Sequence, residues 1–166
     1  MGGVKQAGEL ADVPMVTFDE FYARERLMMV RVAYLITRSR PVAEEVVQDA
    51  FMAVLQRWGS IDSPGGYLRQ TVVRAAVATR KRAWRGRVLE RANSESQTDE
   101  PGIDEMRAAL THLPPKQRAA VVLRFYCDLP HADVADALNC TVATARSLTH
   151  RALTALRKDM DRWTKP

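Results

Sequence analysis

The sequence predicts an all-α protein built from two small helical domains joined by a flexible acidic linker, the second domain containing a helix-turn-helix. Three observations support this prediction. Apolar residues recur at three- and four-residue steps in seven segments, none of which shows the alternation typical of a strand. Residues 87–102 are polar, acidic and poor in large apolar side chains. The chain has 166 residues, 46% of them hydrophobic and 27% charged, which suits one average domain or two small ones.

The first domain is expected over residues 17–86, after a flexible N-terminal tail of residues 1–16. Its first helix starts at Thr17, because Thr17 and Glu20 have the spacing of a capping box. The helical period of apolar residues then continues to about Arg38.

Two further helices complete the first domain. Ser39 can cap the second helix, whose apolar stripe covers residues 42–58, and Gly59 ends it. The loop at residues 60–66 is rich in Ser, Pro and Gly, and it leads into a third helix that ends near Trp84.

The second domain is expected over residues 103–166, beyond the linker of residues 87–102. Prolines at positions 114, 115 and 130 and a short polar turn at residues 139–141 divide it into four helices. These helices are predicted at residues 103–112, 115–127, 131–138 and 142–163.

Composition excludes several classes of protein. No apolar run reaches the ~18–20 residues of a membrane-spanning helix, and the N-terminus lacks the apolar stretch of a secretory signal. Cys127 and Cys140 cannot form a disulfide framework, and with the three histidines they lack the spacing of zinc ligands. We therefore expect a cytoplasmic protein without metal, cofactor or membrane insertion. Both cysteines are expected to be buried thiols, and the methionines expected in the core are Met28, Met29, Met52 and Met106.

Positive charge gathers in the third helix. The net charge of the chain is only +5, but residues 69–91 carry eight basic residues and one acid. Basic residues interleaved with aromatic ones can bind a phosphate backbone and stack on exposed bases, although a solvated basic face over core aromatics is an alternative. The candidate nucleic-acid contacts in this segment are Tyr67, Arg69, Arg74, Arg80, Arg82, Trp84 and Arg85.

Residues 131–157 have the layout of a helix-turn-helix. A short amphipathic helix is followed by a tight turn and by a helix that is polar and basic on one side. Small Ala135 allows the two helices to cross closely, and Thr141 can cap the second helix. The second helix of such a motif enters the major groove of DNA with its N-terminus first. An αα-hairpin without a ligand is the alternative. The candidate DNA contacts are Thr144, Arg146, Ser147, His150 and Arg151.

The two domains together resemble a bacterial RNA polymerase sigma factor of the minimal extracytoplasmic-function (ECF) type, over about residues 17–163. The segment AEEVVQDAFMAVLQRW at residues 43–58 resembles the polymerase-binding helix of this family, and residues 64–85 are similar to the helix that meets the promoter −10 element. Residues 109–157, with a leucine-proline pair, Arg118 and the helix TVATARSLTHRAL, resemble the domain that binds the −35 element. The segment RWGSIDSPGGYLRQTVV resembles an actinobacterial subgroup.

The resemblance implies a transcription initiation factor that directs core RNA polymerase to promoters and is not itself an enzyme. The first domain would hold the melted −10 strand, with flipped bases near residues 60–66, and the second would read the −35 element as duplex. An anti-sigma protein is a further family expectation. An acidic amphipathic helix suits a basic coiled-coil partner, although a solvated acidic face is the alternative. The residues that would dock on core polymerase are Glu44, Glu45, Gln48, Asp49 and Phe51.

The sequence departs from the family pattern at positions that bear on the promoter sequence rather than on the fold. In the −10 helix, Ala75 and Thr79 stand where the family commonly has Asn and Asp. In the −35 helix, Ala143, Arg146 and Leu148 stand where Gly, Lys and Arg are usual.

The length of the linker is compatible with two promoter elements. Its 16 residues span at most roughly 53–58 Å. At about 3.4 Å per base pair, this distance covers on the order of 16 base pairs of duplex.

Two other functions stay open from the sequence alone. A transcription regulator that acts without polymerase would bind its operator tightly on its own, and an interaction protein would bind only a protein partner. A small nucleic-acid enzyme is disfavoured, because no His, Cys or Gly-rich loop accompanies the carboxylates of Glu44, Glu45 and Asp49.

Overall fold

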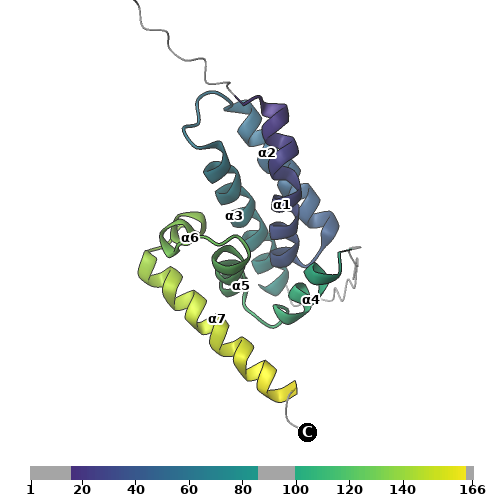
Figure 1. Cartoon of the computed structure of the whole chain (residues 1–166), viewed down its shortest axis with the longest axis vertical. Coiled ribbons are helices and arrows are strands. Elements are labelled where there is room, and N and C mark those ends of the chain that lie inside the picture. Colours follow the sequence, from purple (N-terminus) through teal and green to yellow (C-terminus); the bar gives the residue numbers. More distant parts are fainter. Residues whose placement is uncertain (1–15, 86–99, 164–166) are drawn as a thin grey trace, which may run out of the picture.

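The structure is a computed structural model that describes residues 16–85 and 100–163, and within these ranges it contains helices and no strand (Figure 1). This confirms the all-α prediction. The predicted tail up to residue 15 and residues 87–99 of the predicted linker lie outside the described residues. So do the side chains of residues 83–85, 101 and 161–163.

Three long helices form the first half of the fold: α1 (Phe18–Thr37), α2 (Arg40–Gln56) and α3 (Pro64–Arg85). The predicted capping box starts α1. The Thr17 hydroxyl accepts a hydrogen bond from the Glu20 N–H at 3.2 Å, and the Glu20 carboxylate accepts one from the Thr17 N–H at 2.9 Å. All three predicted helices of the first domain are therefore present, with ends within a few residues of the predicted ones.

Aromatic side chains close one end of this three-helix unit. The rings of Phe18 and Phe21 lie 5.4 and 5.2 Å from the ring of Trp58, and Phe21 lies 6.0 Å from Phe51. Such edge and tilted contacts add to the free energy gained by burying the rings. The chain then turns at Gly59, whose φ of 88° is one that glycine adopts without strain.

The last six residues of α1 are buried on every side. Residues 32–37 are all at most 5% exposed. A helix that is apolar all round must be covered all round, because an exposed apolar face would be costly. Helices α2 and α3 cover only part of α1, and helices from the second half of the chain supply the remainder.

The second half contains α4 (Pro101–Ala109), α5 (Pro115–Val121), the π-helical turn η1 (Val122–Tyr126), α6 (His131–Leu138) and α7 (Val142–Trp163). The predictions for α6 and α7 match these bounds. Helix α4 begins two residues before the predicted start at 103, inside the predicted linker. The predicted helix at 115–127 changes from α to π turns after residue 121.

The two halves pack against each other, which the sequence analysis did not predict. Helices α5 and α6 lie on α3, and α4 lies beside α1 (Figure 1). Two side-chain contacts reinforce this packing at α1. Arg31 Nε donates to Glu100 Oε2 at 2.7 Å, and the Tyr34 hydroxyl donates to Asp104 Oδ1 at 2.8 Å.

The guanidinium group of Arg118 joins the two halves from inside the protein. Arg118 is 1% exposed and donates hydrogen bonds of 2.8–3.0 Å to the carbonyls of Leu110, Thr111 and Leu113, which fix the turn between α4 and α5. Its fourth hydrogen bond, of 2.9 Å, goes to the carbonyl of Ile36 near the end of α1.

Burial lowers the pKa of Arg118 to about 9, and the positive charges of Arg80 and Arg38 act in the same direction. The group therefore stays charged at neutral pH, and the four carbonyls stabilise that charge.

Replacing Arg118 by Met is expected to destabilise the fold by at least about 3 kcal/mol. The substitution keeps an apolar side chain of similar length but leaves buried carbonyls without a donor. Urea unfolding followed by circular dichroism measures the loss. Lys116→Met is the matched control, because Lys116 is exposed on the same helix and its replacement should change stability by less than about 0.5 kcal/mol. Equal losses for the two variants would contradict the role given to Arg118.

Candidate nucleic-acid interface

Helices α6 and α7 form the predicted helix-turn-helix. Asn139 ends α6 in the left-handed conformation, with φ 52°. Thr141 then caps α7, since its hydroxyl oxygen accepts a hydrogen bond from the Thr144 N–H at 3.1 Å. The turn between the helices is therefore set by local backbone and capping interactions, as the sequence predicted.

One face of α7 is exposed. The opposite face is buried through Ala145, Thr149 and Ala152, which are at most 4% exposed where α7 packs on α5 and α6. The structure brings all five predicted DNA contacts of this helix to the exposed side. They are Thr144, Arg146, Ser147, His150 and Arg151.

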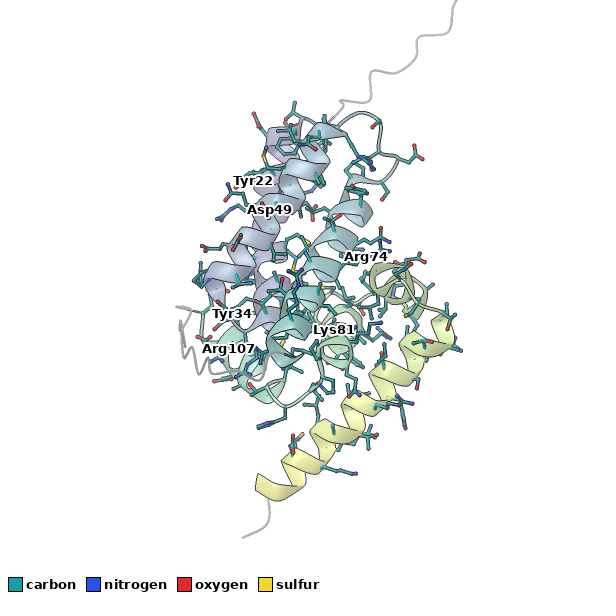
Figure 2. The ribbon with its side chains drawn as sticks, turned by 180° about the vertical axis from the view of Figure 1, so that it is seen from behind. Tyr22, Tyr34, Asp49, Arg74, Lys81 and Arg107 are labelled. Carbon is teal, nitrogen blue, oxygen red and sulfur yellow. The ribbon has the colours of Figure 1, made fainter. Side chains whose placement is uncertain are left out.

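The predicted contacts on α3 do not share one environment. Arg74 and Arg82 are exposed, whereas Tyr67 and Arg69 are half-buried, and the Arg57 guanidinium lies 5.8 Å from the centre of the Tyr67 ring. Arg74 is labelled in Figure 2, beside α6. The side chains of two further predicted contacts, Trp84 and Arg85, lie outside the described residues.

Arg80 differs from the other predicted contacts because it is turned toward the interior. Burial lowers the pKa of Arg80, and its charge in turn acts on Arg118. Within the described ranges its Nε is a buried donor that has no hydrogen-bond partner. Arg80 is therefore poorly placed to meet a phosphate in this arrangement.

A cavity of about 670 Å³ lies at the start of α3, next to the loop at residues 60–66. Flipped bases are predicted near this loop from the family resemblance. Helix α6 lines the other side of the cavity. The charged and aromatic residues around it are Glu25, Tyr67, Arg69 and Arg74 from the first half and Asp133 and Asp136 from α6.

The departures from the family pattern on α3 lie at half-buried positions. The Thr79 hydroxyl donates a hydrogen bond of 2.9 Å to the carbonyl of Ala75. The Thr79 hydroxyl therefore has its hydrogen-bond acceptor within the helix, and neither side chain offers a carboxylate or a side-chain amide to a base.

The acidic side of α2 forms a second polar surface. Glu45, Gln48 and Asp49 are exposed, and Glu44 is half-buried with its carboxylate 3.1 Å from Arg40 Nε. Phe51, the fifth predicted contact, is only 3% exposed and packs within the aromatic cluster under this surface.

Exposed apolar residues that the sequence analysis did not select accompany the acidic side of α2. Tyr22 is 39% exposed, and its ring lies 4.7 Å from that of Phe51. Figure 2 shows Tyr22 on α1 near Asp49 of α2. Met52 and Leu55 are 51% and 45% exposed, so the prediction that Met52 is a core residue is wrong. The amphipathic pattern of α2 does not predict the exposure of Met52 and Leu55, because the pattern does not show how far the neighbouring helices extend over α2.

The described residues give no indication of a metal site or a membrane-spanning helix. In residues 16–85 and 100–163, no group of three or more His, Cys, Asp and Glu side chains could hold a metal ion. No helix in these ranges is long and apolar enough to cross a membrane. Cys127 and Cys140 are free thiols and half-buried, and Cys140 lies at the cavity beside α3.

Family comparisons agree with the two halves of the structure. Residues 21–86 match the family model described as Sigma-70 region 2, and residues 103–156 match the one described as Sigma-70, region 4. The RNA polymerase sigma-E factor of Streptomyces coelicolor is 30% identical, over 88% of this chain and 87% of the relative. The ECF RNA polymerase sigma factor SigE of Mycolicibacterium smegmatis is 28% identical, over 90% of this chain and 63% of the relative.

Solved structures share the fold. CnrH, in complex with the cytosolic domain of CnrY, superposes with a TM-score of 0.65 at 18% identity, over 87% of this chain and 88% of CnrH. The sigma factor RpoE of Bartonella quintana, in complex with the anti-sigma factor NepR, gives a TM-score of 0.64 at 21% identity. That match covers 86% of this chain and 98% of RpoE.

Alkylation of Cys127 in the folded chain is expected to be slow and steeply dependent on pH. Burial raises the pKa of this thiol from 9.0 to about 11, so little thiolate is present at neutral pH. At pH 8, reaction with iodoacetamide should be roughly a hundredfold slower than in the urea-denatured chain, and its rate should rise with pH up to about 11. Peptide mass spectrometry of a time course measures both rates. Equal rates in the folded and denatured chains would show that the thiol is not shielded.

Proposed function

The chain belongs to the extracytoplasmic-function RNA polymerase sigma factors, which are promoter-recognising transcription initiation factors, and from this premise we propose how its surfaces divide the work. Helix α2 binds core RNA polymerase, α3 binds the melted −10 strand, and α7 reads the −35 element as duplex. The observation that carries this division is that the exposed candidate contacts differ in chemistry between the three helices: they are acidic or amide side chains on α2, arginines on α3, and arginines with hydroxyl groups and a histidine on α7.

The chemistry of α7 favours duplex DNA. Its N-terminal turns present Arg146 and Arg151 beside short hydroxyl side chains, and the capped end of the helix is the end that enters a major groove. Arginine can neutralise a phosphate or make a bidentate hydrogen-bond contact with the O6 and N7 atoms of a guanine. The turn between α6 and α7 fixes the angle at which the helix is presented.

The chemistry of α3 favours a single strand. Arg69 and Arg74 lie next to a cavity large enough for a base, and the ring of Tyr67 lines that cavity. Stacking on an aromatic ring and contacts between guanidinium groups and phosphates are the two main sources of affinity for unpaired bases. The absence of an amide or carboxylate at Ala75 and Thr79 leaves less direct reading of base edges here.

The chemistry of α2 favours a basic protein partner. An acidic row over exposed Tyr22, Met52 and Leu55 combines charge complementarity with apolar area, as protein interfaces do. Phe51 would support this surface from beneath, because it is buried against the ring of Tyr22. We place core polymerase on this face.

Three further properties follow from the proposed function. The chain acts in the cytoplasm, where polymerase and promoter DNA are found, and it carries out no catalytic step of its own. An anti-sigma protein controls it by covering one of the three surfaces. The complexes of CnrH with CnrY and of RpoE with NepR support this last proposal, because the described fold is shared with both.

Reversing the charge of Asp49 is expected to weaken binding to core polymerase by roughly a hundredfold. Asp49→Arg places a like charge against the proposed basic partner, which costs several kcal/mol. Co-elution with purified core polymerase in size-exclusion chromatography and a titration by fluorescence anisotropy measure the effect. Glu105→Arg, at an exposed position on α4, is the matched control. If Asp49→Arg binds like the control, the polymerase interface lies elsewhere.

Removing two guanidinium groups from α7 is expected to reduce −35-dependent initiation by at least about tenfold without changing polymerase binding. In Arg146→Ala/Arg151→Ala the fold should persist, because both side chains are exposed, whereas each lost DNA contact costs on the order of 1–3 kcal/mol.

The assay is transcription of fragmented host DNA by core polymerase, with sequencing of transcript 5′ ends. The wild-type chain should give discrete transcription starts that share two upstream motifs. The variant should lose the starts that depend on the −35 motif. Polymerase binding without discrete starts from the wild type would contradict the proposed function.

A further inference from the structure

A second, smaller cavity lies where α5 and the end of α6 meet α3. It has a volume of about 270 Å³. Its wall on α3 is formed by positions 74, 77, 78 and 81, which follow the three- and four-residue steps of one helical face. Lys116 of α5, together with Leu138 and Asn139 at the end of α6, completes the lining. Both halves of the chain therefore contribute to this cavity.

The lining of the smaller cavity is cationic. Arg74, Lys81 and Lys116 line it, and the described residues around it include no carboxylate. Figure 2 shows Arg74 and Lys81 on α3, beside the second half of the chain. The larger cavity at the start of α3 differs, because three carboxylates accompany its two guanidinium groups. The smaller cavity thus attracts anions, whereas the larger one carries its own counter-charges.

Two of the three cations have no carboxylate partner. Arg74 and Lys116 are exposed and form no ion pair within residues 16–85 and 100–163. Gln70 Nε2 and Arg74 Nη2 donate hydrogen bonds of 2.9 and 3.4 Å to the carbonyl of Asp136, which is a neutral acceptor. Like charges that converge on one cavity repel each other, and an anion placed between them removes that repulsion. An anion can therefore bind to Arg74 and Lys116 without displacing an ion pair.

The floor of the cavity is apolar. Val77 and Leu138 are 6% and 7% exposed, and Ala78 adds a third apolar side chain. An inorganic ion would contact the cations and leave this floor unused, whereas a ligand with an anionic group and a flat ring would contact both. The side-chain amide of Asn139, which also lines the cavity, can donate and accept hydrogen bonds, as the edge of a nucleobase requires.

We propose that this cavity binds a nucleoside diphosphate, with its phosphates against Lys81 and Lys116 and its base on Val77 and Leu138. The volume lies just below the range of about 300–1,000 Å³ that is common for ligand pockets, which suits one nucleotide rather than a longer chain.

This inference goes beyond the proposed function, because it adds a small-molecule ligand to the polymerase and promoter surfaces. The walls of the cavity come from both halves of the chain, so a bound nucleotide stabilises their packing by mass action. The chain thereby responds to the concentration of a free nucleotide.

Removing the two lysine charges tests the assignment. Lys81→Gln/Lys116→Gln keeps polar side chains at both positions but leaves the phosphates only one neighbouring cation. Arg157→Gln/Lys158→Gln, at exposed positions on α7 that do not line the cavity, changes the net charge of the chain equally and is the matched control. Ala78→Leu is a second variant, which keeps every charge and fills part of the cavity. Circular dichroism checks that all three variants are folded.

Fluorescence anisotropy with N-methylanthraniloyl-ADP in magnesium-free buffer gives the affinity of the full chain. The lysine variant should bind this probe at least about tenfold more weakly than the control, because it loses two charge-assisted contacts with phosphate. Ala78→Leu should bind it at least about fivefold more weakly than the wild type, because the apolar floor is filled. Saturating ADP should raise the midpoint of thermal unfolding for the wild type and the control and leave that of the lysine variant unchanged.

Competition experiments identify which parts of the ligand are bound. Unlabelled ADP should displace the probe from the wild type. Adenosine and pyrophosphate, each of which offers only one part of the ligand, should need concentrations at least about tenfold higher. A short single-stranded DNA without a terminal phosphate should not displace the probe.

Four outcomes would overturn the proposal. Equal losses for the lysine variant and the control would show general electrostatic attraction rather than a site. Full binding by Ala78→Leu would place the nucleotide elsewhere, and competition by pyrophosphate as strong as that by ADP would show that no base is bound. These three outcomes leave the function assigned to α3 untouched, because neither lysine is among its candidate strand contacts. If the single-stranded DNA displaces the probe, the cavity belongs to the strand site instead.

Discussion

A buried guanidinium group, satisfied by four backbone carbonyls, stands where the two halves of the fold meet. Arg118 fixes the turn between α4 and α5 through three of these carbonyls, and through the fourth it fixes that turn against the end of α1. A charge of this kind is tolerated in a protein interior only when its donors are satisfied. The position of the second half on the first, and with it the contact of α6 with α3, depends on this arrangement.

The sequence predicted what local interactions determine. The helices, the capping box at Thr17, the cap at Thr141 and the exposed side of α7 all follow from residues within a few positions of one another. Phe51 is buried inside the aromatic cluster, whereas its neighbour Met52 is exposed. This difference depends on how far α1 extends over α2. A helical period reports which residues share a face, and it does not report how far a neighbouring helix extends over that face.

The packing of the two halves could not be predicted for a further reason. Three of its hydrogen bonds end on the carbonyls of Ile36 and Asp136, whereas those from Arg31 and Tyr34 end on the carboxylates of Glu100 and Asp104. Every residue type offers a carbonyl, so these acceptors leave no trace in the sequence. The donors are visible, but Arg74 and Gln70 suit a phosphate equally well. The candidate surfaces for polymerase and duplex could be predicted from the sequence because they consist of side chains. The contact of α5 and α6 with the first half could not, because its hydrogen bonds end on main-chain oxygens.

Main-chain acceptors also make the joint between the halves tolerant of genetic drift. A substitution at position 36 or 136 changes the side chain and leaves the accepting oxygen in place, provided that the helix persists. In these main-chain hydrogen bonds, a single replacement can remove the donor side chain and cannot remove the acceptor. Libraries of random variants should therefore contain many in which the exposed acceptor position 136 differs and few in which Arg118 does, and engineers who wish to loosen this contact have to replace its donors.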